Sequence, residues 1–275
     1  MVVLGGAGML GTDVCRVCGQ RGYSVTALDL PEFDITDAAV VEQAIETADV
    51  VVNCAAYTNV DGAESEQDIA YAVNAEAVGQ LGRIIGRLDK WVLHVGTDFV
   101  FDGGGDRPWT EDDQPNPVNV YGASKLAGEK LLGESGCDNC IVRVEWTYGR
   151  AGNNFVRKLL QVAKGRQQIK VVADQIGSPT STLEAAEVIF ELAQQQLTGL
   201  YHFAAAGYVS RYEMAKFVFE QLGVKTEVVP CGSDQFPSPA KRPLNSRFCC
   251  DKIRKASGVD IKNWQEPLRR YLETL

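Results

Sequence analysis

Apolar blocks and helical repeats alternate along the first half of the chain. Runs of Val, Ile, Leu and Ala predict strands at residues 2–6, 24–30, 48–56, 90–98 and 139–145. Apolar residues at three- to four-residue spacing predict helices at about 9–21, 37–47 and 68–88, and another around Tyr121. Strands that form continuous apolar blocks between helices are typical of a parallel sheet covered on both faces. We therefore predict an α/β fold with a Rossmann-type doubly wound parallel sheet.

The second half is less regular. Helices at about 153–164 and 182–196 and strands at 169–174 and 200–205 could extend the sheet. After Gly207, two short helices, a Pro-rich loop at 231–247 and a final amphipathic helix predict a smaller C-terminal lobe. We assign 1–144, with about 169–205, to the sheet domain and about 145–168 and 206–275 to this lobe.

Composition limits the class of protein. The chain has 275 residues, of which 45% are hydrophobic and 23% charged, and a formal charge of −9. This is typical of a globular protein, and the negative charge argues against a nucleic-acid partner. No apolar run is long enough for a membrane span, and the N-terminal stretch MVVLGGAGMLG has no basic region, so we expect no membrane partner, no signal peptide and a cytoplasmic location.

Eight cysteines include two pairs with C-x-x-C spacing, Cys15 with Cys18 and Cys137 with Cys140. This spacing is compatible with a zinc or redox site. Cys15 and Cys18, however, fall in the first predicted helix on one face. We favour reduced, packed cysteines and expect no metal site.

A glycine-rich stretch, GGAGMLG, follows the first predicted strand and opens the first helix. Gly5, Gly8 and Gly11 form a G-x-x-G-x-x-G pattern, which lets backbone N–H groups approach a pyrophosphate at a helix N-terminus. Three glycines alone could mark a tight turn, but the strand–turn–helix context favours dinucleotide binding.

Asp29 ends the second predicted strand, where a carboxylate can accept hydrogen bonds from the adenosine ribose. It would repel a 2′-phosphate, and no Lys or Arg follows in residues 30–32. The cofactor is therefore expected to be NADH or NADPH, with Asp29 favouring NADH. The alternative is that Asp29 is an ordinary turn residue at the end of the strand.

Tyr121 and Lys125 lie four residues apart in a predicted helix and therefore share a face. An ammonium beside a phenol would lower the tyrosine pKa, so that the tyrosine donates a proton to a carbonyl oxygen as a hydride arrives. Thr97 ends the fourth predicted strand and could hold that oxygen. These three residues are our predicted catalytic set.

Together these features resemble the extended short-chain dehydrogenase/reductase superfamily. Longer segments narrow the resemblance to dTDP-4-dehydrorhamnose reductases; they are NCAAYTNVDGAESE (53–66), GTDFVFDG (96–103), Pro108–Trp109, NVYGASKLAGEK (119–130), RVEWTYG (143–149), GNNF (152–155), VADQIGSPT (172–180) and PSPAKRPLNSR (237–247). The resemblance spans nearly the whole chain, in order.

The resemblance implies reduction of the 4-keto group of dTDP-4-dehydro-β-L-rhamnose, with a dinucleotide-binding sheet domain and a sugar-nucleotide-binding lobe. Lys125 would also hold the nicotinamide ribose, and Arg242 would pair with the diphosphate. The implied cofactor-binding residues are Gly5, Gly8, Met9, Leu10, Gly11, Asp29, Asp34, Ile35, Ala55, Ala56, Tyr57, Tyr121 and Lys125. The implied substrate-binding residues are Thr58, Val60, Asp98, Trp146, Asn154, Gln175 and Arg242.

Several of these residues have simpler alternatives. Trp146 could be core packing, Arg242 a solvated surface charge and Asn154 a helix cap. Asn74 matches a position that supports the active site in related reductases, but could equally be a surface amide. We interpret His94 and His202, which both lie in strand patterns, as packed or hydrogen-bonded core residues.

Three positions depart from the family pattern. Phe99 stands where Tyr is usual and removes a hydroxyl, and Gly96 replaces a common Ser, so that Thr97 carries the hydroxyl role alone. Glu145 replaces a small polar residue and could alter which sugar fits.

Two other functions remain open at this stage. One is another nucleotide-sugar reductase or an epimerase, which would retain its cofactor. The other is a non-catalytic regulatory subunit resembling the methionine adenosyltransferase β subunit, although Trp146 and the PAKRPLNSR loop favour the enzyme. The sequence leaves open a homodimer, an interface metal, the NADH or NADPH preference and thymidine or uridine selectivity.

Overall fold

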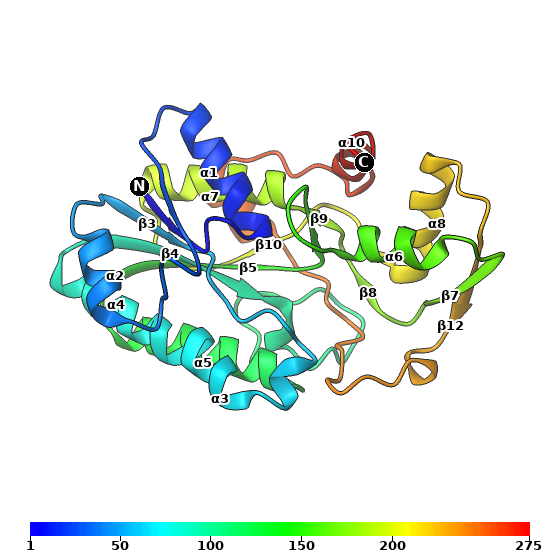
Figure 1. Ribbon diagram of the computed structural model, residues 1–275, viewed down its shortest axis with the longest axis horizontal. Helices are drawn as coiled ribbons and strands as arrows, with labels where there is room; N and C mark the ends of the chain where they lie inside the picture. The colour runs from blue at the N-terminus through cyan, green and yellow to red at the C-terminus, as the bar shows by residue number, and fades with distance from the viewer.

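The computed structural model describes residues 1–275 and is built around a six-stranded parallel sheet (Figure 1). Its strands lie in the order β2-β1-β3-β4-β5-β10. Their bounds are β1 Val2–Leu4, β2 Thr26–Leu28, β3 Val50–Asn53, β4 Trp91–Thr97, β5 Asp138–Val144 and β10 Gly199–Phe203. The order reverses between β1 and β3, which places a ligand crevice at the carboxyl ends of the strands. The predicted fold class is confirmed.

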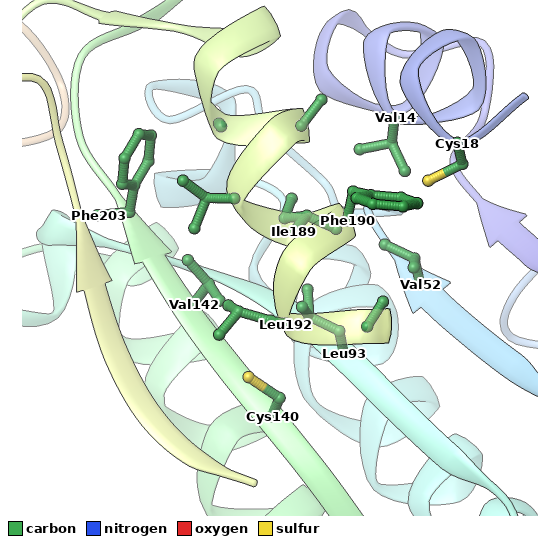
Figure 2. Close-up of a cluster of buried hydrophobic side chains, with 14 of the residues drawn as sticks. Val14, Cys18, Val52, Leu93, Cys140, Val142, Ile189, Phe190, Leu192 and Phe203 are labelled. Carbon is green, nitrogen blue, oxygen red and sulfur yellow. The ribbon is translucent and has the colours of Figure 1, made fainter. Parts of the chain in front are cut away.

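Helices cover both faces of this sheet (Figure 1). One face carries α1 (Met9–Gln20) and α7 (Thr182–Gln195), and the other carries α2 (Ala38–Ile45), α4 (Ala77–Arg87) and α5 (Val120–Glu134). Figure 2 shows the core under α1 and α7, where helix side chains meet strand side chains. The residues drawn there include Val14, Val52, Leu93, Val142, Ile189, Phe190, Leu192 and Phe203.

Neighbouring residues of one strand enter opposite cores. Val52 and Leu93 belong to the core under α1 and α7, whereas Val51 and Val92 belong to the core under α2, α4 and α5. Side chains alternate between the faces of a strand, so burial of both faces requires unbroken apolar runs. This explains why the strand sequences are continuous apolar blocks.

Free thiols occupy part of this core. All eight cysteines are unpaired, and Cys18 and Cys140 are fully buried beneath α7 (Figure 2). Burial raises the pKa of the Cys18 thiol to about 11 and that of Cys140 to about 12, so both are protonated packing groups. No group of three or more His, Cys, Asp or Glu side chains is arranged to hold a metal ion.

The helix predicted at 68–88 is interrupted. The structure has α3 (Gln67–Tyr71), a π-helical segment (Ala72–Glu76) and then α4. A π-helical turn shifts the phase of the side chains and is frequent at functional sites. Here the segment contains Asn74, which is fully buried.

The smaller lobe has its own hydrophobic core, built from α6 (Phe155–Ala163), α8 (Arg211–Leu222) and α10 (Gln265–Leu272). In it, β7 (Gln168–Val172) pairs in parallel with β12 (Glu227–Cys231). The prediction that the strand at 169–174 could extend the main sheet is therefore wrong, and β12 was not predicted at all. The side chains of β7 alternate between exposed and buried, unlike those of a strand covered on both faces.

Short segments complete the chain. The two-residue strands β6 (Thr147–Tyr148) and β9 (Thr180–Ser181) pair, as do β8 (Ile176–Gly177) and β11 (Val209–Ser210). Helix α9 (Asp251–Ser257) returns to the sheet domain, because Ile253 packs in the core under α7.

Our domain division stays a proposal, with β7 moved to the lobe and α9 to the sheet domain. The 3₁₀ turns are Gly62–Glu64, Asp98–Val100 and Ser233–Gln235. No helix combines the length and apolar character that a membrane crossing needs.

Candidate active site

A cavity of about 610 Å³ lies at the carboxyl ends of the sheet strands. Its wall combines loops that follow β1 to β5 with Trp146, Phe155 and Arg211, of which the last two begin helices of the smaller lobe. This volume is typical of a small-molecule site. The cavity is therefore the candidate binding site.

The glycine loop forms one end of this cavity. Gly5 has φ +73°, and a Cβ added there would lie 2.6 Å from the Ala55 nitrogen; one added at Gly11 would lie 2.1 Å from the Gly5 carbonyl oxygen. Only glycine fits this tight approach of loop, strand and helix. Gly8 caps α1 without a side chain, which leaves the first N–H groups of the helix free for a phosphate. Predicted residues that line this end are Gly5, Gly8, Met9, Leu10 and Gly11.

Asp29 follows β2 and lines the same end of the cavity. Its Oδ2 accepts a hydrogen bond from the Ala7 N–H at 2.9 Å, and its Oδ1 accepts one from the Leu30 N–H at 2.9 Å. The carboxylate therefore holds the glycine loop as well as its own turn, and both interpretations of Asp29 fit the structure. The predicted residues Asp34, Ile35, Ala55 and Ala56 also line the cavity.

Tyr57 is the one predicted cofactor residue that does not line the cavity. Its hydroxyl donates to Glu66 at 2.5 Å. Asn74 accepts a hydrogen bond from the Tyr57 N–H at 2.9 Å and donates to the Tyr57 carbonyl at 3.1 Å and to Ser124 Oγ at 3.1 Å. Asn74 is thus a buried tie between the loop after β3 and α5, and the surface-amide alternative is wrong. The tie fixes the backbone just before Thr58, which faces the cavity.

Thr97, Tyr121 and Lys125 line one region of the cavity. Thr97 ends β4, and the other two residues lie one turn apart at the start of α5. Asn119 caps this helix by accepting the Gly122 N–H at 2.7 Å. The Tyr121 ring is held by Phe99 in an edge-to-face contact with ring centroids 5.4 Å apart. The structure therefore brings the predicted catalytic set together.

The Lys125 ammonium has other partners than we predicted. Its Nζ donates to the Val95 carbonyl at 2.7 Å and lies 3.2 Å from His94 Nε2. Burial raises the pKa of Tyr121 to about 12, although the Thr97 hydroxyl lowers it, and lowers the pKa of Lys125 to about 8. The prediction that Lys125 brings the Tyr121 pKa down toward working pH is therefore wrong for this arrangement. Tyr121 is therefore protonated at neutral pH and has a proton to give to a substrate.

A buried row of side chains supports Lys125 from behind. Asn53 Oδ1 accepts the Ala55 N–H at 3.0 Å, so its amide nitrogen faces His94 Nδ1 at 3.1 Å. Only one nitrogen of a neutral imidazole accepts a hydrogen bond, so His94 accepts either from the Asn53 amide or from the Lys125 ammonium. Burial and the lysine both lower the pKa of His94, which keeps the ring neutral. His94 is a hydrogen-bonded core residue, as we predicted, but its contact with Lys125 was missed.

Asp98 joins the catalytic strand to the smaller lobe. Thr97 Oγ1 donates to Asp98 Oδ1 at 3.1 Å, and Ser246 Oγ donates to Asp98 Oδ2 at 2.5 Å. Burial raises the pKa of Asp98 to about 6 despite these hydrogen bonds. Asp98 lines the cavity as predicted. Ser246 was not singled out from the sequence.

Trp146 lines the cavity from a strained turn, since its φ is +46°, which is rare for a bulky residue. The preceding Glu145 is buried and accepts the Ser178 N–H at 2.8 Å and the Phe248 N–H at 3.3 Å. Burial raises the pKa of Glu145 well above its usual range. Glu145 does not line the cavity, so the expectation that it alters which sugar fits has no support from a direct contact; it anchors the turn that presents Trp146. Val60, also predicted, lines the cavity too.

Asn154 and Gln175 do not line the cavity. Asn154 caps α6 by accepting the Arg157 N–H at 3.1 Å and also donates to Gly149 and Tyr271, so its helix-cap alternative is correct. Gln175 donates to Ser233 Oγ at 3.2 Å. Both residues shape the smaller lobe, where they hold loops that approach the cavity.

Arg242 is also outside the cavity lining. Its two terminal nitrogens donate to the two Asp61 oxygens, each at 2.8 Å, and one of them also donates to the Ala240 carbonyl at 2.6 Å. Arg242 thus forms a bidentate ion pair with Asp61 that is partly exposed to solvent and lies outside the cavity lining. The predicted diphosphate contact has no support from this geometry.

Several lining residues were missed in the sequence. The GNNF segment could have indicated Gly152, Asn153 and Phe155, because it was already singled out. Arg211 carries no such signal, since it is one residue at the start of a helix in the less regular half of the chain. The unpredicted lining residues are Leu30, Phe33, Cys54, Val73, Val95, Gly96, Phe99, Val144, Thr147, Gly152, Asn153, Phe155 and Arg211.

The parallel sheet, glycine loop and cavity define a Rossmann-type dinucleotide-binding protein. The chain belongs to the RmlD family, because the model of the RmlD substrate binding domain matches residues 1–275. A dTDP-4-dehydrorhamnose reductase of Mycolicibacterium smegmatis is 39% identical over 274 residues, covering 98% of this chain and 84% of that protein. The spore coat polysaccharide biosynthesis protein SpsK of Bacillus subtilis is 36% identical, covering 99% of this chain and 96% of SpsK.

Solved structures agree with this assignment. A Bacillus anthracis dTDP-4-dehydrorhamnose reductase in complex with NADP has a TM-score of 0.95 and 34% identity, covering 100% of this chain and 98% of that one. The Clostridium acetobutylicum enzyme has the same TM-score and identity over 99% of this chain and 98% of its own. The resemblance to the dTDP-4-dehydrorhamnose reductases is thereby confirmed at the level of the family.

Proposed function

We propose that this protein reduces the 4-keto group of dTDP-4-dehydro-β-L-rhamnose, giving dTDP-L-rhamnose at the expense of NADH or NADPH. The observation that carries the proposal is the meeting of Thr97, Tyr121 and Lys125 in a cavity that continues to the glycine loop. A relative that is 39% identical is a dTDP-4-dehydrorhamnose reductase, and a similar structure holds NADP. We extend both properties to this chain.

The residues at the loop end fit a dinucleotide. The cradle formed by Gly5 and Gly11 has no room for a Cβ, and the uncapped start of α1 offers N–H donors to a pyrophosphate. Asp29 would accept hydrogen bonds from the adenosine ribose, which favours NADH. When bound, the reduced nicotinamide supplies the hydride that adds to the keto carbon.

Tyr121 supplies the proton. Its phenol is protonated at neutral pH, so its Oη can give a proton to the sugar oxygen as negative charge develops there. Lys125, with a pKa of about 8, is mainly an ammonium at neutral pH, and its positive charge would favour loss of the Tyr121 proton. The Thr97 hydroxyl donates to Asp98 in this structure and would turn its one hydrogen to the keto oxygen in order to orient the keto group. Trp146 offers an apolar wall to the sugar.

The test mixes purified protein with dTDP-4-keto-6-deoxyglucose and the 3,5-epimerase that produces the L-sugar, while NADH or NADPH absorbance is followed. We expect oxidation that depends on the epimerase, with dTDP-L-rhamnose as product. Oxidation without the epimerase would instead indicate a reductase of another keto sugar. Dinucleotide binding with no oxidation would overturn the proposal in favour of a regulatory subunit, and a tightly retained cofactor that is never consumed would favour an epimerase.

A further inference from the structure

Arg211 occupies an unusual place in the cavity wall. It is the first residue of α8, and its guanidinium carbon lies 3.5 Å from the centre of the Trp146 ring and 4.8 Å from that of Phe155. Both rings line the same cavity. A guanidinium that stacks on aromatic faces uses its own face for that contact and keeps its edge for hydrogen bonds.

The edge of this guanidinium has no partner within the protein. The Arg211 backbone N–H donates to the Gln175 carbonyl at 3.3 Å, whereas the Arg211 side chain makes no hydrogen bond. No carboxylate oxygen comes within the 4.0 Å of an ion pair. Arg211 is half-buried and lines the cavity, so its free N–H donors are open to the cavity and available to a ligand that brings acceptors.

The neighbouring carboxylates are already engaged. Asp98 receives hydrogen bonds from Thr97 and Ser246, and Glu145 receives backbone N–H groups. Both lie near enough to favour the charged form of Arg211, which burial opposes by lowering its pKa to about 10. Arg211 therefore stays cationic at neutral pH without an ion-pair partner.

The other cations near the cavity are committed elsewhere. Arg242 is bound to Asp61, and Lys125 is bound to Val95 and His94. Arg211 is the one arginine among the lining residues. A cation in this cavity would favour the binding of a substrate with a diphosphate, and Arg211 is the free one.

We infer that Arg211 binds an oxyanion of the substrate through the edge of its guanidinium, while Trp146 and Phe155 hold its face. This rests on the proposed function, which supplies a substrate of the nucleoside-diphosphate sugar class. In the proposed substrate this oxyanion is a phosphoryl oxygen of the diphosphate, because the deoxy sugar has no carboxylate. In another nucleoside-diphosphate sugar it could instead be a carboxylate on the sugar. Arg211 thus takes the part that the sequence suggested for Arg242.

The test measures ligand binding by calorimetry, without turnover. Wild-type protein, Arg211→Gln and Arg242→Gln are each titrated with dTDP and with thymidine. A charge-assisted contact of this kind predicts about 10- to 100-fold weaker dTDP binding for Arg211→Gln, with thymidine unaffected. Arg242→Gln is the matched control and should bind dTDP like the wild type. NADH affinity reports whether each variant is folded, and Arg211→Lys, expected to lose several-fold, replaces the Gln variant if that fails to fold.

The outcomes separate the two sources and the two proposals. Loss of dTDP affinity confined to Arg211 variants identifies the diphosphate. If Arg211→Gln binds dTDP and dTDP-glucose like the wild type but binds dTDP-glucuronate more weakly, the oxyanion lies on the sugar. Equal affinity of wild type and Arg211→Gln for every ligand overturns the inference. Failure of the wild type to bind dTDP at all would instead refute the proposed substrate class.

Discussion

The ion pair between Glu129 and Arg143 offers a quantitative test of how the catalytic helix is held. Glu129 lies on α5, one turn beyond Lys125, and Arg143 lies on β5. The guanidinium donates to Glu129 at 3.1, 3.1 and 2.6 Å, and the two side chains are only 3% and 5% exposed. Arg143 also lies 3.3 Å from His202 Nε2.

We predict that Glu129→Gln destabilises the protein by about 3–5 kcal/mol, because it leaves the Arg143 charge buried without its counter-ion. For a chain of this size, that corresponds to a melting temperature lower by about 6–20 °C. The assay is urea unfolding followed by circular dichroism, with a thermal scan in parallel. The matched control is Glu42→Gln, whose ion pair with Arg87 has side chains 45% and 56% exposed and should contribute less than about 1 kcal/mol.

A double variant separates charge from packing. Glu129→Leu with Arg143→Met removes both charges, and such replacements are often neutral or stabilising. We expect it to recover most of the stability that the single change loses. A Glu129→Gln variant as stable as Glu42→Gln would refute the reasoning, and so would a double variant as unstable as the single one.

Three further predictions concern the site. Tyr121→Phe should lower kcat by at least about 100-fold with little change in cofactor affinity, because it removes the proton donor; near-normal turnover would exclude Tyr121 from the chemistry. Asp29→Ala should weaken both cofactors, since Asp29 also holds Ala7, but should raise NADPH use relative to NADH; an unchanged ratio of kcat/KM would place selectivity elsewhere. Asp98 has a pKa of about 6 in the fold, against 3.8 as its ordinary value, so its contribution to stability is present at low pH and is lost as pH rises through 6. The free energy of unfolding of the wild type, measured in urea, should fall between pH 4 and pH 7, and in Asp98→Asn this fall should be smaller by about 2 kcal/mol. An equal fall in both proteins would contradict the cost of burying the Asp98 charge.

Local patterns were enough to predict the sheet and the centre of the site. The strands that end at Asn53 and Thr97 are buried on both faces, so apolar blocks revealed them. The glycine loop and the Tyr121–Lys125 spacing each depend on residues close together in the chain. Parallel strands bring their carboxyl ends to one edge, and this alone places Thr97 beside Tyr121.

Other features depend on the direction of a side chain in the folded protein. The sequence places Lys125 on the right helix face but cannot show that its amine turns to His94. Arg242 lies in a recognisable loop, yet Asp61, from a distant segment, determines where it points. Arg211 reaches the cavity only because the smaller lobe folds over the sheet edge, and no local periodicity reports that.

Gly96 packs directly against the buried ion pair between Glu129 and Arg143. A Cβ at position 96 would lie 2.5 Å from Glu129 Oε1 and 2.8 Å from Arg143 Cγ. Both contacts are with side-chain atoms, so a Cβ at this position would have to push the Glu129 carboxylate and the Arg143 side chain aside. Arg143 holds the carboxylate at both oxygens, so a shift of Glu129 would be passed to α5, the helix that carries Tyr121 and Lys125. Substitutions at positions 96, 129 and 143 should therefore be non-additive, because the three residues are in contact. A side chain placed at position 96 would act on the active site twice: directly beside Thr97, and from behind through the helix that holds the proton donor.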